Sequence, residues 1–329
     1  MNSGSCVNLG AIHNDNLHTK QKYLVEVPRL SSSPQNYSVQ EILRKLSALW
    51  KKKAAVNNRQ LDYSELEFNF DLNDFSESLL PFKDHDAWKS APTNIKSQCL
   101  SYAWAIYNMK TIYIECDIVT PACEDIIKSP PIGGRNRYLL QDVMAEAMLD
   151  EALHTKMSIG ACNYIYEMRG IVPLNFNEFN LISWKNNVLG QCSAEWERRL
   201  TRFGIACASE TLITDYLKLM SEDESIQSIC QQVTRTHAVD EWSHSSVFSY
   251  AAIEIIHGLS RSEREYLKKL IPKTVEMFAD NEMKAWEAVF SMVNFPNYVD
   301  IIEDSHKLGE IDIYQGSVDS LLQRIGLDN

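Results

Sequence analysis

The chain has 329 residues, of which 45% are hydrophobic, so it can close one sizeable core. Its 32 lysines and arginines stand against 44 aspartates and glutamates, a net charge of −12, and no basic run occurs that could neutralise a phosphate backbone, which argues against nucleic acid as a partner. No run of about 18 apolar residues and no basic-then-apolar start appears, so no membrane association and a cytoplasmic location are expected.

Helical periodicity organises most of the chain after a polar start. Residues 1–36 are rich in Asn, Ser and His and show no sustained period, so they are expected to form a poorly ordered N-terminal arm. Residues 37–329 are expected to form a single helical domain. Its first helix is predicted from the capping box Ser38-x-x-Glu41 to about Lys53, and residues 57–91 are predicted to form short helices and loops.

The remaining pattern predicts long helices at about 93–120, 136–168, 191–220, 222–257 and 262–293, and a last helix near 318–325. Pro121 is expected to end or kink the first of them. Two capping boxes, Ser221-x-x-Glu224 and Ser262-x-x-Glu265, are expected to begin the last two long helices.

The pattern therefore predicts an all-α fold, because no strand-like alternation of comparable length competes with the helices. The expected architecture is a ferritin-like four-helix bundle core, over about residues 93–257, with additional flanking helices. In such a scaffold, carboxylate-bridged metal pairs are built from one Glu on each of two helices and a Glu-x-x-His on each of the other two.

Two E-x-x-H pairs of the chain are each preceded by an aspartate: Asp150-Glu151-x-x-His154 and Asp240-Glu241-x-x-His244. Both lie inside long helices among apolar and small residues, where an acidic side chain must be paired or bound to metal to offset its desolvation. They are the expected centre of a dinuclear metal site.

Two further E-x-x-H pairs, Glu254/His257 and Glu303/His306, are interpreted as unrelated to the site. His257 lies roughly 220° around the helix from His244 and is expected to cap the helix end before a glycine. His306 lies in a stretch too polar for a core helix and is expected at the surface.

Residues at i and i+3 share one face of a helix, so Glu151 and His154 are expected to bind one ion, and Glu241 and His244 the other. His237, four residues before Glu241, is expected to add a third ligand on that same face. Asp150 and Asp240 are expected to accept the second ring N–H of a ligand histidine across the bundle, which orients the ring.

The other two carboxylates must come from the two remaining helices. Glu210 is the choice in the helix at 191–220, because Glu195 and Glu197 beside two arginines indicate a charged outer face. Glu115 is the one glutamate of the helix at 93–120, with Asp117 as the alternative. Four carboxylates balance two divalent ions, and the three imidazoles favour iron, with manganese or a mixed pair as the alternative.

The ligand pattern resembles the dinuclear iron N-oxygenases typified by the p-aminobenzoate N-oxygenase AurF and the arylamine oxygenase of chloramphenicol biosynthesis. The similar set is Glu115, Glu151-x-x-His154, Glu210 and His237-x-x-x-Glu241-x-x-His244, over about residues 93–257. The third histidine, His237, is the specific part, because ordinary ferritin-like oxidases use two.

The resemblance implies a helical homodimer in secondary-metabolite biosynthesis, with two iron ions, O2 as co-substrate and an external electron donor. It implies oxidation of an amine nitrogen to the hydroxylamine, nitroso or nitro level, and does not distinguish a small free amine from a carrier-tethered one. Two alternatives fit the same residues. One is another ferritin-like diiron oxidase or a radical-generating protein with its radical on Tyr107 or Tyr113, and the other is a non-catalytic iron-binding protein.

Overall fold

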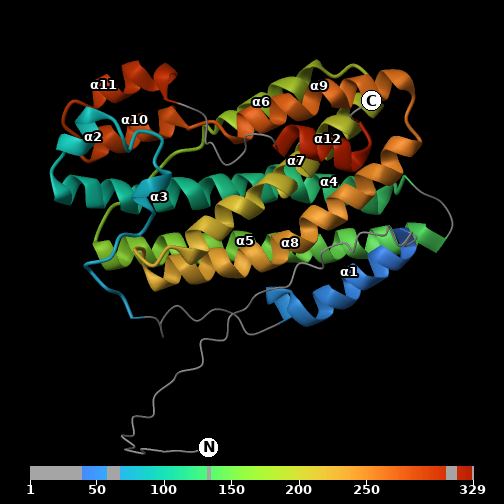
Figure 1. The fold of residues 1–329 in the computed structure, drawn as a ribbon, viewed down its shortest axis with the longest axis horizontal. Helices are drawn as coiled ribbons and strands as arrows, with labels where there is room; N and C mark the ends of the chain where they lie inside the picture. The colour runs from blue at the N-terminus through green and yellow to red at the C-terminus, as the bar shows by residue number, and fades with distance from the viewer. Residues whose placement is uncertain (1–38, 58–66, 132–134, 309–316, 328–329) are drawn as a thin grey trace, which may run out of the picture. The chain divides into compact units, whose positions relative to one another are not determined.

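The computed structural model describes residues 39–57, 67–131, 135–308 and 317–327, and these form helices joined by loops and short turns (Figure 1). The helices are α1 (Val39–Lys53), α2 (Asp86–Ser90), α3 (Thr93–Ile114), α4 (Thr120–Lys128), α5 (Arg135–Arg169), α6 (Asn180–Gln191), α7 (Glu195–Glu222), α8 (Ser228–His257), α9 (Arg261–Phe278), α10 (Met283–Met292), α11 (Tyr298–Glu303) and α12 (Ser317–Ile325). Within the described ranges no strand occurs, and Asn73 and Ile226 form one isolated bridge. The all-α prediction is confirmed.

Four long helices, α3, α5, α7 and α8, build the core of the fold. The helix α7 packs along α8, α3 along α5, and α5 along α8. Every side chain from Cys99 to Ile106 on α3 is buried, as expected for a helix covered by neighbours on all sides. The helix α1 lies across α5 and α8 on one side of this core, and α9 covers α7 on the other (Figure 1).

The helical segment that begins with α3 continues through Pro121 into α4, so of the two predicted effects, an end or a kink, the proline does not produce an end. Between α3 and α4, residues Glu115–Val119 form a π-helical turn, and the N–H of Thr120 bonds to the carbonyl of Glu115. Pro121 therefore falls in the first positions of α4, where a missing N–H costs little. Such turns are often found at functional sites.

The predicted start at 222 is wrong by six residues, and the start predicted at 262 differs by one residue from that of α9 at Arg261. The helix α8 begins at Ser228 because the side chain of Asp223 accepts hydrogen bonds from the N–H and hydroxyl of Ser225, which turns the chain after α7. The capping box of α9 involves Ser260 and Glu263. The predicted boxes at residues 221 and 262 therefore do not start these helices.

The helix predicted at 262–293 is interrupted between α9 and α10. The side chain of Asp280 accepts the N–H of Glu282 at 2.8 Å, and Glu282 itself has a left-handed backbone with φ 51°. This local turn ends the helical hydrogen bonding that the sequence pattern would otherwise continue. The helix α6 is an addition that the pattern did not predict.

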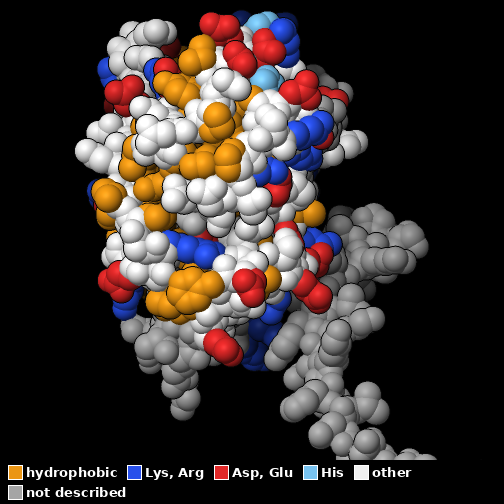
Figure 2. All heavy atoms as spheres, turned by 90° about the vertical axis from the view of Figure 1, so that its left-hand side faces the viewer, with side chains coloured by type: hydrophobic (Ala, Val, Ile, Leu, Met, Phe, Trp, Pro, Cys, Tyr) orange, Lys and Arg blue, Asp and Glu red, His pale blue; other side chains and the backbone are white. Residues whose placement is uncertain are grey.

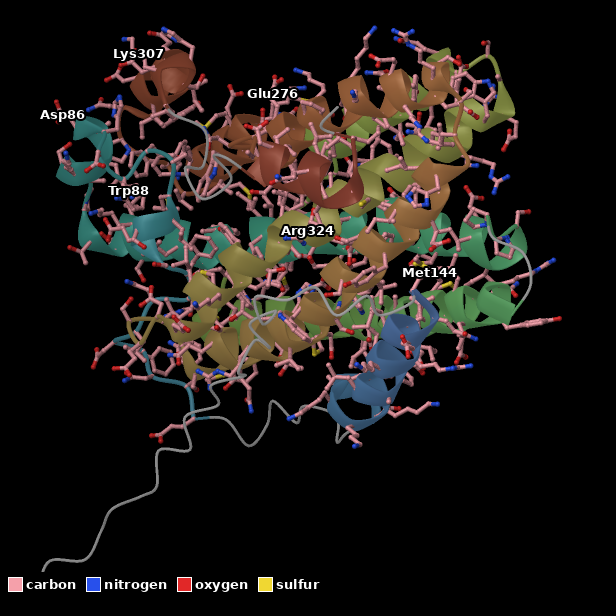
Figure 3. All side chains as sticks on the ribbon, turned by 45° about the vertical axis from the view of Figure 1, so that its right-hand side comes forward. Asp86, Trp88, Met144, Glu276, Lys307 and Arg324 are labelled. Atoms are coloured by element: carbon pink, nitrogen blue, oxygen red, sulfur yellow. The ribbon has the colours of Figure 1, made fainter. Side chains whose placement is uncertain are left out.

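In Figure 3, Trp88 of α2 and Met144 of α5, both fully buried, lie toward opposite ends of the long helices. Figure 2 shows that the face formed around α2, α10 and α11 carries interspersed acidic and basic side chains around areas of hydrophobic ones.

Residues Ser38–Asn329 cluster as one unit, and the predicted arm at 1–36 and the capping residue Ser38 lie outside the described residues. None of the helices in the described ranges combines the length and the apolar composition that a membrane span requires. The final helix predicted at 318–325 is present as α12.

Candidate metal centre

Seven buried side chains from the four core helices converge on two adjoining clusters. The first contains Glu115, His154, His237 and Glu241, and the second contains Glu151, Glu210, Glu241 and His244. Within each cluster the potential ligand atoms all lie within 4.8 Å of one another. Every residue that the sequence singled out as a ligand is thus brought to one place.

Glu241 belongs to both clusters, and it changes the expected grouping of the ligands. The sequence analysis placed Glu151 with His154 on one ion; the structure groups His154 with His237, and Glu151 with His244, while Oε2 of Glu151 also lies 3.0 Å from Nδ1 of His154. Each cluster therefore combines residues of α5 with residues of α8. The reason is that the two helices pack side by side, so each projects side chains toward both positions.

Glu115 reaches the first cluster from the π-helical turn that follows α3. It is 4% exposed, and its Oε1 lies 3.4 Å from Nε2 of His237. The alternative candidate, Asp117, is outside both clusters, and its backbone carbonyl accepts a hydrogen bond from Lys185 at 2.9 Å. The glutamate is therefore the better candidate of the two.

The two D-E-x-x-H histidines present equivalent ring atoms to the centre. Nδ1 of His154 faces Glu151 and Glu241 at 3.0 and 3.3 Å, while its Nε2 lies 3.2 Å from Oδ2 of Asp240. For a neutral ring with its proton on Nε2, this arrangement leaves the Nδ1 lone pair for a metal.

The second histidine repeats this arrangement with the roles of the two helices exchanged. Nδ1 of His244 faces Glu151, Glu210 and Glu241 at 3.1 to 3.4 Å. Its Nε2 lies 3.1 Å from Oδ2 of Asp150. Each aspartate thus supports a histidine of the other helix, and such carboxylates orient ligand histidines and tune their basicity.

The helix α1 and the short turn Ala55–Asn57 that follows it complete these aspartate contacts, which the sequence analysis did not anticipate. The indole N–H of Trp50 donates to Oδ2 of Asp150 at 2.7 Å, and the backbone N–H of Ala55 donates to Oδ1 of Asp240 at 3.2 Å. These residues are about 100 and 185 positions from their acceptors in the sequence, so no local spacing could have revealed them.

The donor set fits a pair of divalent cations. One oxygen of each of Glu115, Glu151, Glu210 and Glu241 is buried without a hydrogen bond to any described residue. Four uncompensated buried carboxylates would be strongly unfavourable, whereas two divalent ions would neutralise them. Imidazole with carboxylate ligands is a combination typical of iron and related transition metals.

The pKa shifts of the clustered residues also indicate an excess of negative charge in the two clusters. Burial, together with the neighbouring carboxylates, raises the pKa values of Glu115 and Glu210 well above the usual range. Burial also raises the pKa of Glu151, but His244 outweighs this and holds it at about 2. Burial lowers the pKa of His244, but the surrounding carboxylates more than reverse this and raise it well above its usual value. The raised pKa values of Glu115, Glu210 and His244 thus favour binding of protons, which offset the negative charge of the carboxylates as metal cations would.

The residues that the sequence analysis set aside lie away from the clusters. His257 is exposed at the last position of α8, and the ring of His306 is exposed and hydrogen-bonded to the carbonyl of Glu303 at 2.9 Å. Glu195 forms surface ion pairs with arginines, and Glu197 accepts the N–H groups that precede α7. The interpretation of these as unrelated residues agrees with their positions.

A largely apolar cavity of about 100 Å³ begins one helical turn from the clusters. On α3 it is lined by Tyr107 and Thr111, which precede Glu115 by eight and four residues, and on α7 by Ile213, three residues after Glu210. Burial raises the pKa of Tyr107 well above its usual value, and Tyr216, Glu115 and Glu241 add to the effect. The Tyr107 hydroxyl is buried without a completed hydrogen bond among the described residues.

The second tyrosine considered from the sequence is placed differently. Tyr113 packs against Phe179, with ring centroids 5.4 Å apart, and does not line the cavity. Sequence reasoning missed the cavity itself, because its walls come from α3, α7 and the segment between α9 and α10.

The sequence of the chain is similar to that of known proteins. The family described as P-aminobenzoate N-oxygenase AurF matches residues 36–326. The 4-aminobenzoate N-oxygenase of Streptomyces thioluteus is 26% identical over 246 residues, which is 74% of this chain and 73% of the relative. The family match spans all four helices that supply the clustered residues.

Proposed function

Because this chain belongs to the family of the p-aminobenzoate N-oxygenase AurF, we propose that its two clusters hold two iron ions and that it oxidises an arylamine nitrogen with O2. Family membership makes the chain an oxidoreductase, an N-oxygenase. The observation that carries the metal proposal is the convergence of four buried carboxylates and three imidazoles with carboxylate oxygens that lack hydrogen bonds.

The proposed ligands of the first ion are Glu115, His154 and His237, and those of the second are Glu151, Glu210 and His244, with Glu241 common to both. When bound, the iron pair supplies the reduction of O2 and the transfer of oxygen to nitrogen. Asp150 and Asp240 keep a proton on Nε2 of His244 and His154, so that the Nδ1 lone pair of each ring remains available to bind a metal ion.

The cavity beside the clusters is the proposed position of the substrate. Its walls are mainly aromatic and aliphatic, so they bind an aryl ring and exclude water from the reacting nitrogen. Thr111 and Ile213 separate the cavity from Glu115 and Glu210, and a ring between them would direct its amine toward the clusters. The proposed substrate is an arylamine, by analogy with the S. thioluteus relative, which is named a 4-aminobenzoate N-oxygenase.

Other parts of the expected function stay predictions. They are a homodimer, an electron-transfer partner, a carrier-tethered form of the substrate, a role in secondary metabolism and a cytoplasmic location. The arm at 1–36 and the single-domain organisation of the rest also stay predictions.

Metal analysis together with amine oxidation tests this proposal. The purified protein should hold two iron ions per chain and, with a chemical reductant and O2, convert an arylamine to hydroxylamine, nitroso or nitro products. Glu241→Ala removes a ligand common to both clusters and should abolish binding of both ions. His237→Ala alters one cluster and should lower iron toward one per chain or change the reaction with O2.

Glu254→Gln is the matched control, since this glutamate belongs to an E-x-x-H pair outside the clusters. It should keep both its iron and its activity. Iron near two per chain in both ligand variants would show that the ligand assignment is wrong. An iron-loaded enzyme that oxidises no arylamine from a broad panel would show that the proposed substrate class is wrong.

A further inference from the structure

One end of the cavity, where Lys110 and Glu282 line it, carries a largely buried ion pair. Nζ of Lys110 on α3 lies 3.0 Å from Oε1 of Glu282, and the two side chains are 15% and 4% exposed. The ammonium group also donates to the carbonyl of Phe278 at 3.0 Å. Among the described residues, Lys110 is the one lysine that lines the cavity, and it already has an anionic partner supplied by the chain.

Hydrogen bonds from α6 and from the segment between α9 and α10 hold the glutamate of this pair in place. The second carboxylate oxygen of Glu282 accepts the backbone N–H of Asn180 at 3.0 Å. Asp280 accepts both the side-chain amide of Asn180 and the backbone N–H of Glu282, each at 2.8 Å. The carboxylate is thus positioned by groups from α6 and from the segment between α9 and α10.

The backbone at Glu282 has an unusual conformation for a residue other than glycine. Its φ is 51° and its ψ is 45°, in the left-handed region that a side chain disfavours. Such conformations persist where the surrounding contacts determine them, and they concentrate at binding and catalytic sites. The strain is therefore consistent with a carboxylate that the fold holds at the cavity for a binding role.

The charges at this end of the cavity do not suit an anionic ligand. Two carboxylates, Asp280 and Glu282, line it together with the ammonium of Lys110. A substrate carboxylate would have to displace Glu282 from the ammonium or lie beside it, and like charges in a buried site repel strongly. Oε1 of Glu282, buried and without an aligned hydrogen bond among the described residues, is instead an available acceptor.

The cavity is too small for more than one aromatic ring. An apolar cavity of about 150 Å³ binds benzene, and the volume here is only about 100 Å³, so a substituted ring enters when side chains of the wall move outward. Lys110 and Glu115 are five residues apart on a continuous helical segment, which corresponds to about 7 to 8 Å along the axis and roughly 140° around it. The ion pair and the clusters therefore meet the cavity from different directions, and a para-substituted ring carries its two substituents in different directions as well.

We propose that this cavity selects a para-substituted arylamine whose remote substituent is a hydrogen-bond donor, such as a hydroxyl or a second amino group, rather than a carboxylate. This inference rests on the proposed arylamine N-oxygenase function, and it departs from the 4-aminobenzoate named for the relative. The specificity-determining residue is Glu282. Its carboxylate pairs with the ammonium group of Lys110 and accepts a hydrogen bond from the remote substituent of the ligand.

Calorimetric titration of the iron-loaded enzyme without O2 tests the proposal as a binding equilibrium, independently of turnover. The ligands are 4-aminophenol, 1,4-diaminobenzene and 4-aminobenzoate. The first two should bind at least about tenfold more tightly than the third, as expected for a hydrogen bond to a charged acceptor set against a repelled carboxylate. Glu282→Gln should remove this preference, because it frees the charge of Lys110 for the carboxylate of 4-aminobenzoate.

Glu287→Gln is the matched control, because it makes the same change at an exposed position of α10 and should leave all three affinities unchanged. Thermal unfolding of Glu282→Gln checks that the variant is folded. Should it fail to fold, Lys110→Gln gives the second test. This variant should not weaken the binding of 4-aminobenzoate more than the binding of 4-aminophenol, because Lys110 does not bind the carboxylate of the ligand.

Tighter binding of 4-aminobenzoate to the wild-type protein, with a preference that Lys110→Gln abolishes, would overturn the inference while leaving the arylamine N-oxygenase function intact. Failure of every arylamine to bind would overturn both. Binding of the donor-bearing ligands with no enzyme-dependent N-oxygenation of them in the presence of a reductant and O2 would support the inference and count against the proposed reaction.

Discussion

Replacing Trp50 by phenylalanine tests whether α1 supports the metal centre from outside the four-helix core. The substitution keeps the aromatic packing and removes one donor, the indole N–H that reaches Oδ2 of Asp150 at 2.7 Å. Asp150 is 0% exposed, and its other oxygen, Oδ1, makes no hydrogen bond among the described residues. After the change, His244 is its remaining hydrogen-bond partner within that part of the chain.

The expected effect follows from the type of hydrogen bond that is lost. A bond to a charged acceptor contributes about 1.5–3 kcal/mol, and loss of a residue that orients a ligand histidine lowers metal affinity by about 10- to 100-fold. We expect iron to dissociate more readily from the cluster that contains His244, and metal-free Trp50→Phe to be destabilised by about 1–3 kcal/mol.

Iron retained after dialysis against a graded series of chelator concentrations measures the affinity, and urea unfolding of the metal-free protein measures the stability. Trp196→Phe is the matched control, since Trp196 is 37% exposed and packs edge-on against Tyr266, outside both clusters. Equal iron retention in Trp50→Phe, Trp196→Phe and wild type would refute the view that α1 orients the ligands.

Three further predictions concern metal removal and packing. The carboxylates around His154 and His244 raise both pKa values in the metal-free protein despite burial, so their stabilising effect is complete below about pH 6.5 and is lost as the pH rises through the raised values. The Tm of the metal-free protein should therefore fall as the pH rises above about 6.5, and that of the iron-loaded protein should not. Arg169→Met removes both guanidinium bonds to the buried carboxylate of Asp74 and should lower the free energy of unfolding by about 3–5 kcal/mol in urea. Gly204→Ala places a Cβ atom 2.9 Å from two leucine side chains of α9. This variant should lower the free energy of unfolding by about 1–3 kcal/mol.

Each of these has an outcome that would contradict it. Parallel pH dependence of Tm in the two metal states would show that the histidines do not cause the effect. Arg137→Met changes an exposed arginine, and an equal loss of stability in both arginine variants would argue against the buried pair. Gly190→Ala in α6 meets nothing within 4 Å and should be neutral or slightly stabilising, because alanine has the higher helix propensity; an equal loss there would show that the contact with the two leucines is not the cause.

The sequence predicted the helices better than the places where they begin, end or break. The all-α class and the helix at 136–168 follow from periodicity, which is a local property, and α5 at Arg135–Arg169 agrees closely. The errors at Pro121, Ser221 and the segment before α10 arise where a π-helical turn or an Asp side chain replaces the helical hydrogen bonds. Such competition depends on geometry that residue type alone does not reveal.

The identities of the clustered residues could be predicted because each relation lies within one helix. Glu151 and His154, or His237 and Glu241, are three or four positions apart, and this spacing places them on one face whatever surrounds the helix. The same helical geometry separates His257 from His244, because 13 residues turn the chain to another face of the helix.

How those residues combine was decided only by the tertiary structure. The pairing of His154 with His237, the sharing of Glu241, the bond from Trp50 to Asp150 and the ion pair at the cavity all join segments far apart in the chain. They depend on how each helix is rotated and packed against its neighbours, and that rotation results from the many side chains that fill the core together. The sequence by itself thus determined which side chains share a helix face, and packing determined which faces meet.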